Sequence, residues 1–252
     1  GSYNTAVGRE AMYGNTSGQN NVALGNRALR QNTTGIGNTS VGSGALYNNT
    51  TGQYNTAVGY QALQACLVDN NLALGVQAGY DISTGYNNTV VGSYAGHTGT
   101  LLQTGSNNTL LGFQAAPTTT SVSNQITLGN SSIATLRCQV TSITALSDAR
   151  DKKDVEDLPV GLDFINKLRP VKFTWDMRPA KDEDGNDVVV GKHDILDAGF
   201  IAQELMAAED EADVAEYLQL TYRDNPDALE ATQGRLIPVL VKRSEEHTSE
   251  LQ

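Results

Sequence analysis

Asn55-Thr56-Ala57-Val58-Gly59 is the stretch that decides the fold, because close variants of it recur along the first half of the chain. The copies begin at positions 4, 21, 38, 55, 71, 88, 108 and 125, so most intervals are 17 residues, with one of 16 and one of 20. Self-similarity at a fixed interval is typical of repeat architectures, in which each repeat packs against its neighbours. We therefore expect a solenoid-like array.

Each repeat combines short strand-forming segments with corner residues. Seven copies carry an alanine three residues after the motif glycine, and turn segments such as residues 49–52 follow. Glycine and asparagine supply the positive φ angles that tight corners need, while β-branched residues favour strands. A helix-turn unit is the alternative, and the glycine and β-branched content opposes it. We predict a mainly β repeat, a parallel β-roll or β-helix of 17-residue units, over residues 1–130.

The predicted layers are narrow. Stacked units share a core of Val, Leu and Ala, and ladders of asparagine satisfy polar groups at the corners. Eight layers at about 4.8 Å each would rise roughly 38 Å. The composition agrees, since only 39% of the chain is hydrophobic and 6% aromatic, too little for one large globular core.

Charge and cysteine content exclude several classes of function. The net charge is −11, which argues against non-specific binding of nucleic acid or of anionic membranes. No run of about 18 apolar residues and no signal peptide is recognisable, so no membrane insertion is expected. Cys66 and Cys138 lack metal-ligand spacing, and we interpret them as small hydrophobic residues.

The two ends of the chain lead to two expectations. The chain starts in mid-repeat at Gly1, so we expect the natural N-terminus to lie upstream. Residues 243–252 match the translation of a common sequencing-adapter oligonucleotide, and we treat them as an artefact. We expect the natural chain to continue beyond Lys242.

The second half predicts a small α+β domain. Residues 131–146 are expected to form an extended linker strand, and charged residues begin abruptly at 147–154. The predicted elements are a helix at 158–168, a strand at 171–175, a turn at 182–187, strands at 188–191 and 198–201, a helix at 202–208 and a last helix from 236.

Metal and cofactor sites are not expected. Asp182, Asp184 and Asp187 surround Gly185 as in a calcium loop, but the spacing departs from the EF-hand pattern, and a polar hairpin turn is the preferred interpretation. His193 has no cysteine or second histidine near it in the sequence, which argues against a zinc site.

The repeat resembles two groups of proteins. The repeated sequence over residues 3–130 is similar to the head repeats of trimeric autotransporter adhesins and to the β-structured shafts of phage fibres. The resemblance implies a trimeric parallel β-roll or β-helix. Ligand binding by the repeats is only weakly implied, because such repeats also serve as spacers.

The second half resembles a more specific family. Four segments, at 146–155, 162–175, 199–205 and 236–242, are similar to the C-terminal intramolecular chaperone domain of phage endosialidases and tail spikes, an auto-processing serine peptidase family. The resemblance implies that residues 147–242 drive trimerisation and folding of the upstream shaft. The domain then cuts itself off.

The resemblance also places the chemistry. The nucleophile is Ser147, the base is Lys152, and the scissile bond joins Leu146 to Ser147; Asp148, Gln203 and Glu204 are candidate supporting residues. A serine hydroxyl needs a nearby base. A lysine acts as one when burial or neighbouring cations favour its neutral form. The competing interpretation is that a Ser-Asp pair before a charged run is an ordinary turn or helix cap.

The sequence therefore predicts a homotrimeric tail-fibre or tail-spike component of a virion, assembled in the host cytoplasm, whose partner is a host-surface receptor or glycan. Its serine peptidase activity would be a single-turnover cut in cis, with no external substrate. The alternatives are a bacterial trimeric surface adhesin with ligand-binding repeats and a chaperone domain that does not cleave. A membrane-tethered transcription factor is a further alternative, which would need an upstream DNA-binding domain; the Asn-Thr-Gly repeat argues against it.

Overall fold

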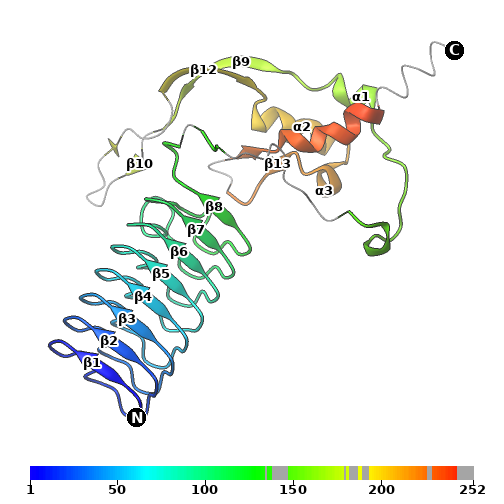
Figure 1. Ribbon diagram of the computed structural model, residues 1–252. Coiled ribbons are helices and arrows are strands. Elements are labelled where there is room, and N and C mark those ends of the chain that lie inside the picture. Colours follow the sequence, from blue (N-terminus) through cyan, green and yellow to red (C-terminus); the bar gives the residue numbers. More distant parts are fainter. Residues whose placement is uncertain are drawn as a thin grey trace. The chain divides into compact units, whose positions relative to one another are not determined.

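The chain divides into two compact units, a solenoid and a smaller α+β unit (Figure 1). The computed structural model describes residues 1–133, 135–137, 147–178, 180–181, 187–188, 193–225 and 229–242. The predicted linker at 131–146 therefore lies largely outside the described residues, and so do Leu146, Cys138, Asp182 and Asp184.

The first unit is a parallel β-solenoid of about seven turns, as the repeat predicted. Each repeat contributes one three-residue strand, and the strands form one eight-stranded sheet in sequence order (Figure 1). Neighbouring strands pair in register, so that Ala57 lies beside Ala73. The strands are β1 (Thr5–Val7), β2 (Val22–Leu24), β3 (Thr39–Val41), β4 (Thr56–Val58), β5 (Leu72–Leu74), β6 (Thr89–Val91), β7 (Thr109–Leu111) and β8 (Ile126–Leu128).

The solenoid core is narrow because small residues line it. The middle residue of each strand from β2 to β7 is buried, and alternate residues of a strand point to opposite faces. The alanines after the motif glycine, such as Ala45 and Ala62, are also fully buried, together with Leu46 and Leu63. The predicted core of Val, Leu and Ala is confirmed.

The corners use more than glycine and asparagine. Leu29, Leu46 and Leu63 are buried leucines that adopt left-handed backbone, with φ between 48° and 51°. This conformation costs a non-glycine residue about 1–2 kcal/mol. Burial of a leucine side chain contributes about 1.5–3 kcal/mol, and the backbone amide of Leu46 also donates to the Ala62 carbonyl at 3.0 Å. The prediction that glycine and asparagine supply the corners was therefore incomplete.

A ladder of buried asparagines runs along the solenoid, as predicted. The backbone amide of Asn71 donates to Asn55 Oδ1 at 2.9 Å, and that of Asn88 donates to Asn71 Oδ1 at 3.0 Å. The side-chain amide of Asn71 donates to the Gly85 carbonyl at 2.9 Å. Each side chain therefore joins its own layer to the next one and satisfies backbone groups that are closed off from water.

The second unit is small and mixed. Phe164, Val214, Leu218, Leu220 and Val239 form the centre of its own apolar core. Its elements are η1 (Ala149–Asp151), α1 (Leu162–Ile165), β9 (Val171–Asp176), β12 (His193–Gly199), α2 (Ala202–Glu211), α3 (Ala215–Leu218), β13 (Thr221–Tyr222), β14 (Glu230–Ala231) and η2 (Gln233–Leu236), and helical backbone continues over residues 237–242. Strands β9 and β12 pair antiparallel, as do β13 and β14.

Several predicted elements are present with other limits. Helix α1 covers four residues rather than the predicted 158–168, because Pro159 and Gly161 precede it and Pro170 follows. Helix α2 extends to Glu211, and of the strand predicted at 198–201 only residues 198–199 are strand, as the end of the longer β12. The predicted turn at 182–187 lies mostly outside the described residues, between the short strands β10 (Ala180–Lys181) and β11 (Asp187–Val188).

Candidate functional site

A tight turn brings Ser147 and Lys152 together. Asp148 caps the 3₁₀ turn η1, since its Oδ1 accepts a hydrogen bond from the Arg150 backbone amide at 2.9 Å. The turn closes with the Lys152 amide donating to the Ala149 carbonyl at 3.2 Å. Lys152 Nζ then donates to Ser147 Oγ at 2.8 Å. The two predicted catalytic side chains are therefore within hydrogen-bonding reach.

Asp148 faces Arg150 rather than the serine. Its carboxylate forms an ion pair with Arg150 Nη2 at 2.6 Å, and Arg150 Nε also donates to it at 3.0 Å. The side-chain and backbone hydrogen bonds from Arg150 hold the pKa of Asp148 below its ordinary value. The same carboxylate raises the pKa of Arg150. Asp148 thus shapes the turn and neutralises one of the two cations that the sequence places near Lys152.

Both members of the pair are exposed in the single chain. Residues 147–157 are all exposed, and Lys153 Nζ lies 3.7 Å from Asp154 Oδ2. Burial favours the neutral form of a lysine, and a general base must hold a free electron pair. The geometry therefore supplies proximity between the two side chains but no burial of them.

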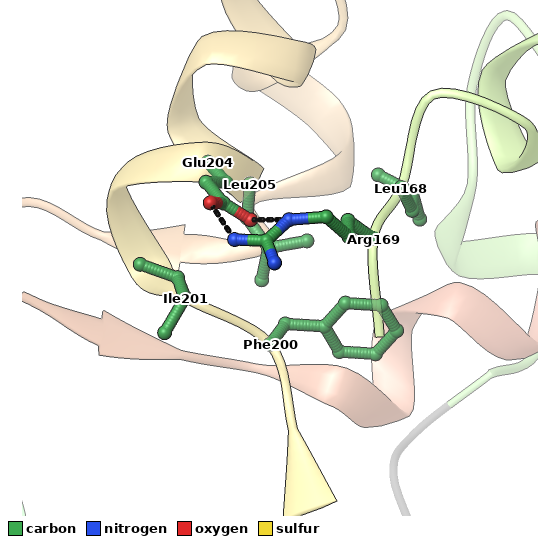
Figure 2. Close-up of a pocket in the computed structure, with 6 residues that line it drawn as sticks. All are labelled: Leu168, Arg169, Phe200, Ile201, Glu204 and Leu205. Atoms are coloured by element: carbon green, nitrogen blue, oxygen red, sulfur yellow. Dashed lines mark hydrogen bonds and ion pairs between the residues drawn. The ribbon is translucent and has the colours of Figure 1, made fainter. Parts of the chain in front are cut away.

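Glu204 and Gln203 lie on the first turn of α2. Glu204 forms a two-point ion pair with Arg169, in which Arg169 Nε lies 3.1 Å from Glu204 Oε2 (Figure 2). This carboxylate raises the pKa of Arg169. The ion pair borders a small pocket that Leu168, Phe200, Ile201 and Leu205 complete (Figure 2). Glu204 therefore joins the start of α2 to the segment before β9, which is a structural role.

A second carboxylate, Glu209, escaped the sequence analysis. Its side chain is fully buried, and its oxygens accept from the Leu220 backbone amide at 2.5 Å and from Thr221 Oγ1 at 2.5 Å. Arg223 Nη2 lies 3.1 Å from Glu209 and Arg223 Nη1 lies 2.7 Å from Asp210. In the sequence, Glu209 belongs to a run of three acidic residues at 209–211, a pattern that is typical of an exposed surface. The signal that it is buried is its spacing of four residues from Leu205, on the core face of α2.

The described residues offer no metal site. They contain no group of three or more His, Cys, Asp or Glu side chains that could hold a metal ion. Asp187 and His193 lie at the ends of the short strand β11 and of β12, and Asp182 and Asp184 lie outside the described part of the chain. Cys66 is buried in the solenoid core, where desolvation raises the pKa of its thiol to about 11, in agreement with a small hydrophobic residue.

The fold and the paired Ser147 and Lys152 define a repetitive β-solenoid followed by a small α+β unit that opens with a serine-lysine pair. Residues 147–214 match the family model described as chaperone of endosialidase, over about a quarter of the chain. Three of the four segments that carried the resemblance overlap this match, and the fourth, at 236–242, lies beyond it. No curated protein and no solved structure matched the chain. No helix among the described residues is both long and apolar enough to cross a membrane.

Proposed function

We propose that the chain is the shaft and chaperone region of a tail-fibre or tail-spike protein, with a β shaft over residues 1–130, a linker over 131–146 and a trimerisation chaperone over 147–242. The order of a long parallel solenoid and a chaperone-of-endosialidase segment supports this proposal. The chaperone-of-endosialidase match supports a virion location as part of the same proposal. The shaft's partner would be a receptor or glycan on the host surface.

Self-cleavage between Leu146 and Ser147 is the chemical part of the proposal, and the 2.8 Å contact between Lys152 Nζ and Ser147 Oγ is the observation that carries it. The neutral amine of Lys152 takes the hydroxyl proton while Ser147 Oγ attacks the Leu146 carbonyl carbon. The peptide C–N bond breaks, the nitrogen of Ser147 gains a proton, and an ester joins Leu146 to Ser147 Oγ. Water then hydrolyses the ester, which releases the shaft and regenerates the hydroxyl.

The proposal predicts that the full-length protein yields two fragments divided at Leu146–Ser147. Ser147→Ala removes the nucleophile and leaves the chain whole, and Lys152→Met removes the base and reduces cutting by at least a hundredfold. A denaturing gel of each freshly purified protein, with N-terminal sequencing of the smaller fragment, measures this. Lys153→Met is the matched control, because the neighbouring lysine contacts Asp154 rather than the serine.

Two results would count against cleavage. One is a wild-type chain that stays whole while its mass in solution is that of a trimer, which leaves a chaperone that does not cut. The other is equal cutting in the Ser147→Ala protein, which assigns the break to a contaminating protease.

A further inference from the structure

The outward face of the solenoid sheet carries a continuous uncharged stripe. We define the outer stripe as the first and third residues of strands β1 to β8, the residues that flank the inward-facing middle position. The third residue is valine or leucine in every strand, and the first is Thr, Val, Leu or Ile. The third residues are Val7, Leu24, Val41, Val58, Leu74, Val91, Leu111 and Leu128.

Six of the eight third residues are exposed in the single chain, and the other two are half-buried. In the middle of the stripe, Val58 is 38% exposed and Leu74 is 36% exposed; towards the two ends Val7 reaches 62% and Leu111 reaches 48%. Isolated exposed valines or leucines are normal on a protein surface, but a row of them, exposed in six of eight successive layers, is a contiguous patch. Such patches mark interaction sites.

Charge is absent from the outer stripe. None of the strand residues is ionisable, and the Asp, Glu, Lys and Arg residues of positions 1–133 all lie in the segments between strands. They are Arg9, Glu10, Arg27, Arg30, Asp69 and Asp81. A face that meets a copy of itself gains from carrying no charge, because like charges would oppose each other across the contact.

The spacing of the repeat favours a second copy of this chain as the partner. The outer stripe presents one row of side chains per layer at the strand spacing, about 4.8 Å. A second copy of the same solenoid presents rows at the same spacing. Rotation about an axis parallel to the stack brings each layer opposite the same layer, which gives a closed symmetric assembly. A partner with another period would match only a few rows.

The area of the outer stripe matches that of the apolar centre of an interface between two copies of the chain. Eight strands span roughly 38 Å, and the two outward residues of a strand lie about 7 Å apart, so the stripe covers roughly 400 Å² with side-chain widths included. A standard interface buries about 800 Å² per partner, with an apolar centre and a polar rim. The exposed rings of Tyr60 and Phe113, one position beyond the motif glycine, extend the apolar area beside the stripe.

We propose that the outer stripe is the surface along which parallel copies of this chain associate. The inference rests on the proposed trimeric shaft, and it adds which face of the solenoid turns towards the other copies.

The test uses the full chain carrying Ser147→Ala, so that both units stay joined. Val58→Asp with Leu74→Asp adds two charges to the middle of the stripe without touching the buried positions. Thr34→Asp with Thr51→Asp is the matched control, since both threonines are exposed at corners of nearby layers. Sedimentation equilibrium should show at least tenfold weaker association for the stripe variant and unchanged association for the control. Circular dichroism checks that each variant folds.

Cross-linking locates the contact. In a chain with Cys138→Ser, we expect Val58→Cys to join copies through a short bis-maleimide and Thr51→Cys to leave them unjoined. Two results would overturn the stripe as the contact surface: an oligomer that cross-links at position 51 and not at 58, or association that is unchanged by the charges added to the stripe. Either result is still compatible with trimerisation by the second unit. If the chain that carries only Ser147→Ala stays monomeric, both the stripe contact and trimerisation by the second unit are overturned. Self-cleavage is tested separately, by the denaturing gel.

Discussion

Two glycines of the third layer, two residues apart, are held by different constraints. Gly42 has φ of 132°, and a Cβ added there would lie 2.3 Å from the Gly59 carbonyl oxygen of the next layer. Gly44 has φ of 70°, and the nearest atom to its added Cβ is Gln61 Cγ at 3.3 Å, on a flexible side chain. Other layers carry Arg27, Gln61 and Gln77 at the Gly44 position with similar φ values.

Alanine at these two positions should therefore have unequal effects. Gly42→Ala forces two layers apart and should lower the free energy of unfolding by about 3 kcal/mol or more. Gly44→Ala pays only for left-handed backbone, about 1 kcal/mol. Urea denaturation followed by far-ultraviolet circular dichroism measures both. Equal losses would mean that the close approach of Gly42 to Gly59 is relieved by a small shift of the layers.

At the scale of single elements, α2 is anchored by a carboxylate that differs from its neighbours. Glu209 is fully buried and receives hydrogen bonds from β13 and its preceding residue, whereas Glu211, two residues later, forms an exposed ion pair with Lys167 at 2.8 Å. The two acids look alike in the sequence. Burial decides their contributions, because breaking a buried pair leaves polar groups without partners.

Glu209→Ala should lower the free energy of unfolding of the second unit by about 3–5 kcal/mol. Glu211→Ala should lower it by less than about 1 kcal/mol, since a surface ion pair contributes little. Fluorescence of Trp175 during urea denaturation measures both, because it is the single tryptophan of the chain and lies on β9. Similar midpoints for the two variants would show that water replaces the partners of Glu209.

The elements that could be predicted are those with a local cause. The interval between copies of the pentapeptide predicted the strands, their parallel order and the buried alanines, because a repeat that stacks on itself needs no distant contact. The pairing of Ser147 with Lys152 is equally local, since one turn of five residues creates it. By contrast, the burial of Glu209 depends on Leu220 and Thr221, which lie more than ten residues away.

The structure differs from the sequence-based prediction at two features. The helix predicted at 158–168 is mostly non-helical, because proline and glycine at its start outweigh its amphipathic pattern. The left-handed leucines contradict local preference altogether. Their conformation is fixed by the layers above and below, whose packing and hydrogen bonds no single repeat reveals.

At the scale of the whole molecule, stability is divided between two cores. The solenoid core consists of alanines and leucines from successive layers, and the core of the second unit is built around Phe164, Val214 and Leu220. No residue belongs to both clusters. Substitutions that share no contacts usually have additive effects, so each unit should respond to its own substitutions.

Asn55→Ala tests this division from the solenoid side. The Asn55 side chain accepts from the Asn71 amide at 2.9 Å and donates to the half-buried Val68 carbonyl at 2.6 Å. Its loss leaves the buried Asn71 amide without a partner and weakens the bonding of the Val68 carbonyl, and should cost about 3 kcal/mol. Asn26→Ala, at an exposed position, should cost almost nothing. We expect Asn55→Ala to shift the circular dichroism transition and to leave the Trp175 fluorescence transition in place, while Glu209→Ala does the reverse. If Asn55→Ala alone instead moves both transitions, the two units unfold as one cooperative body and each contributes to the stability of the other.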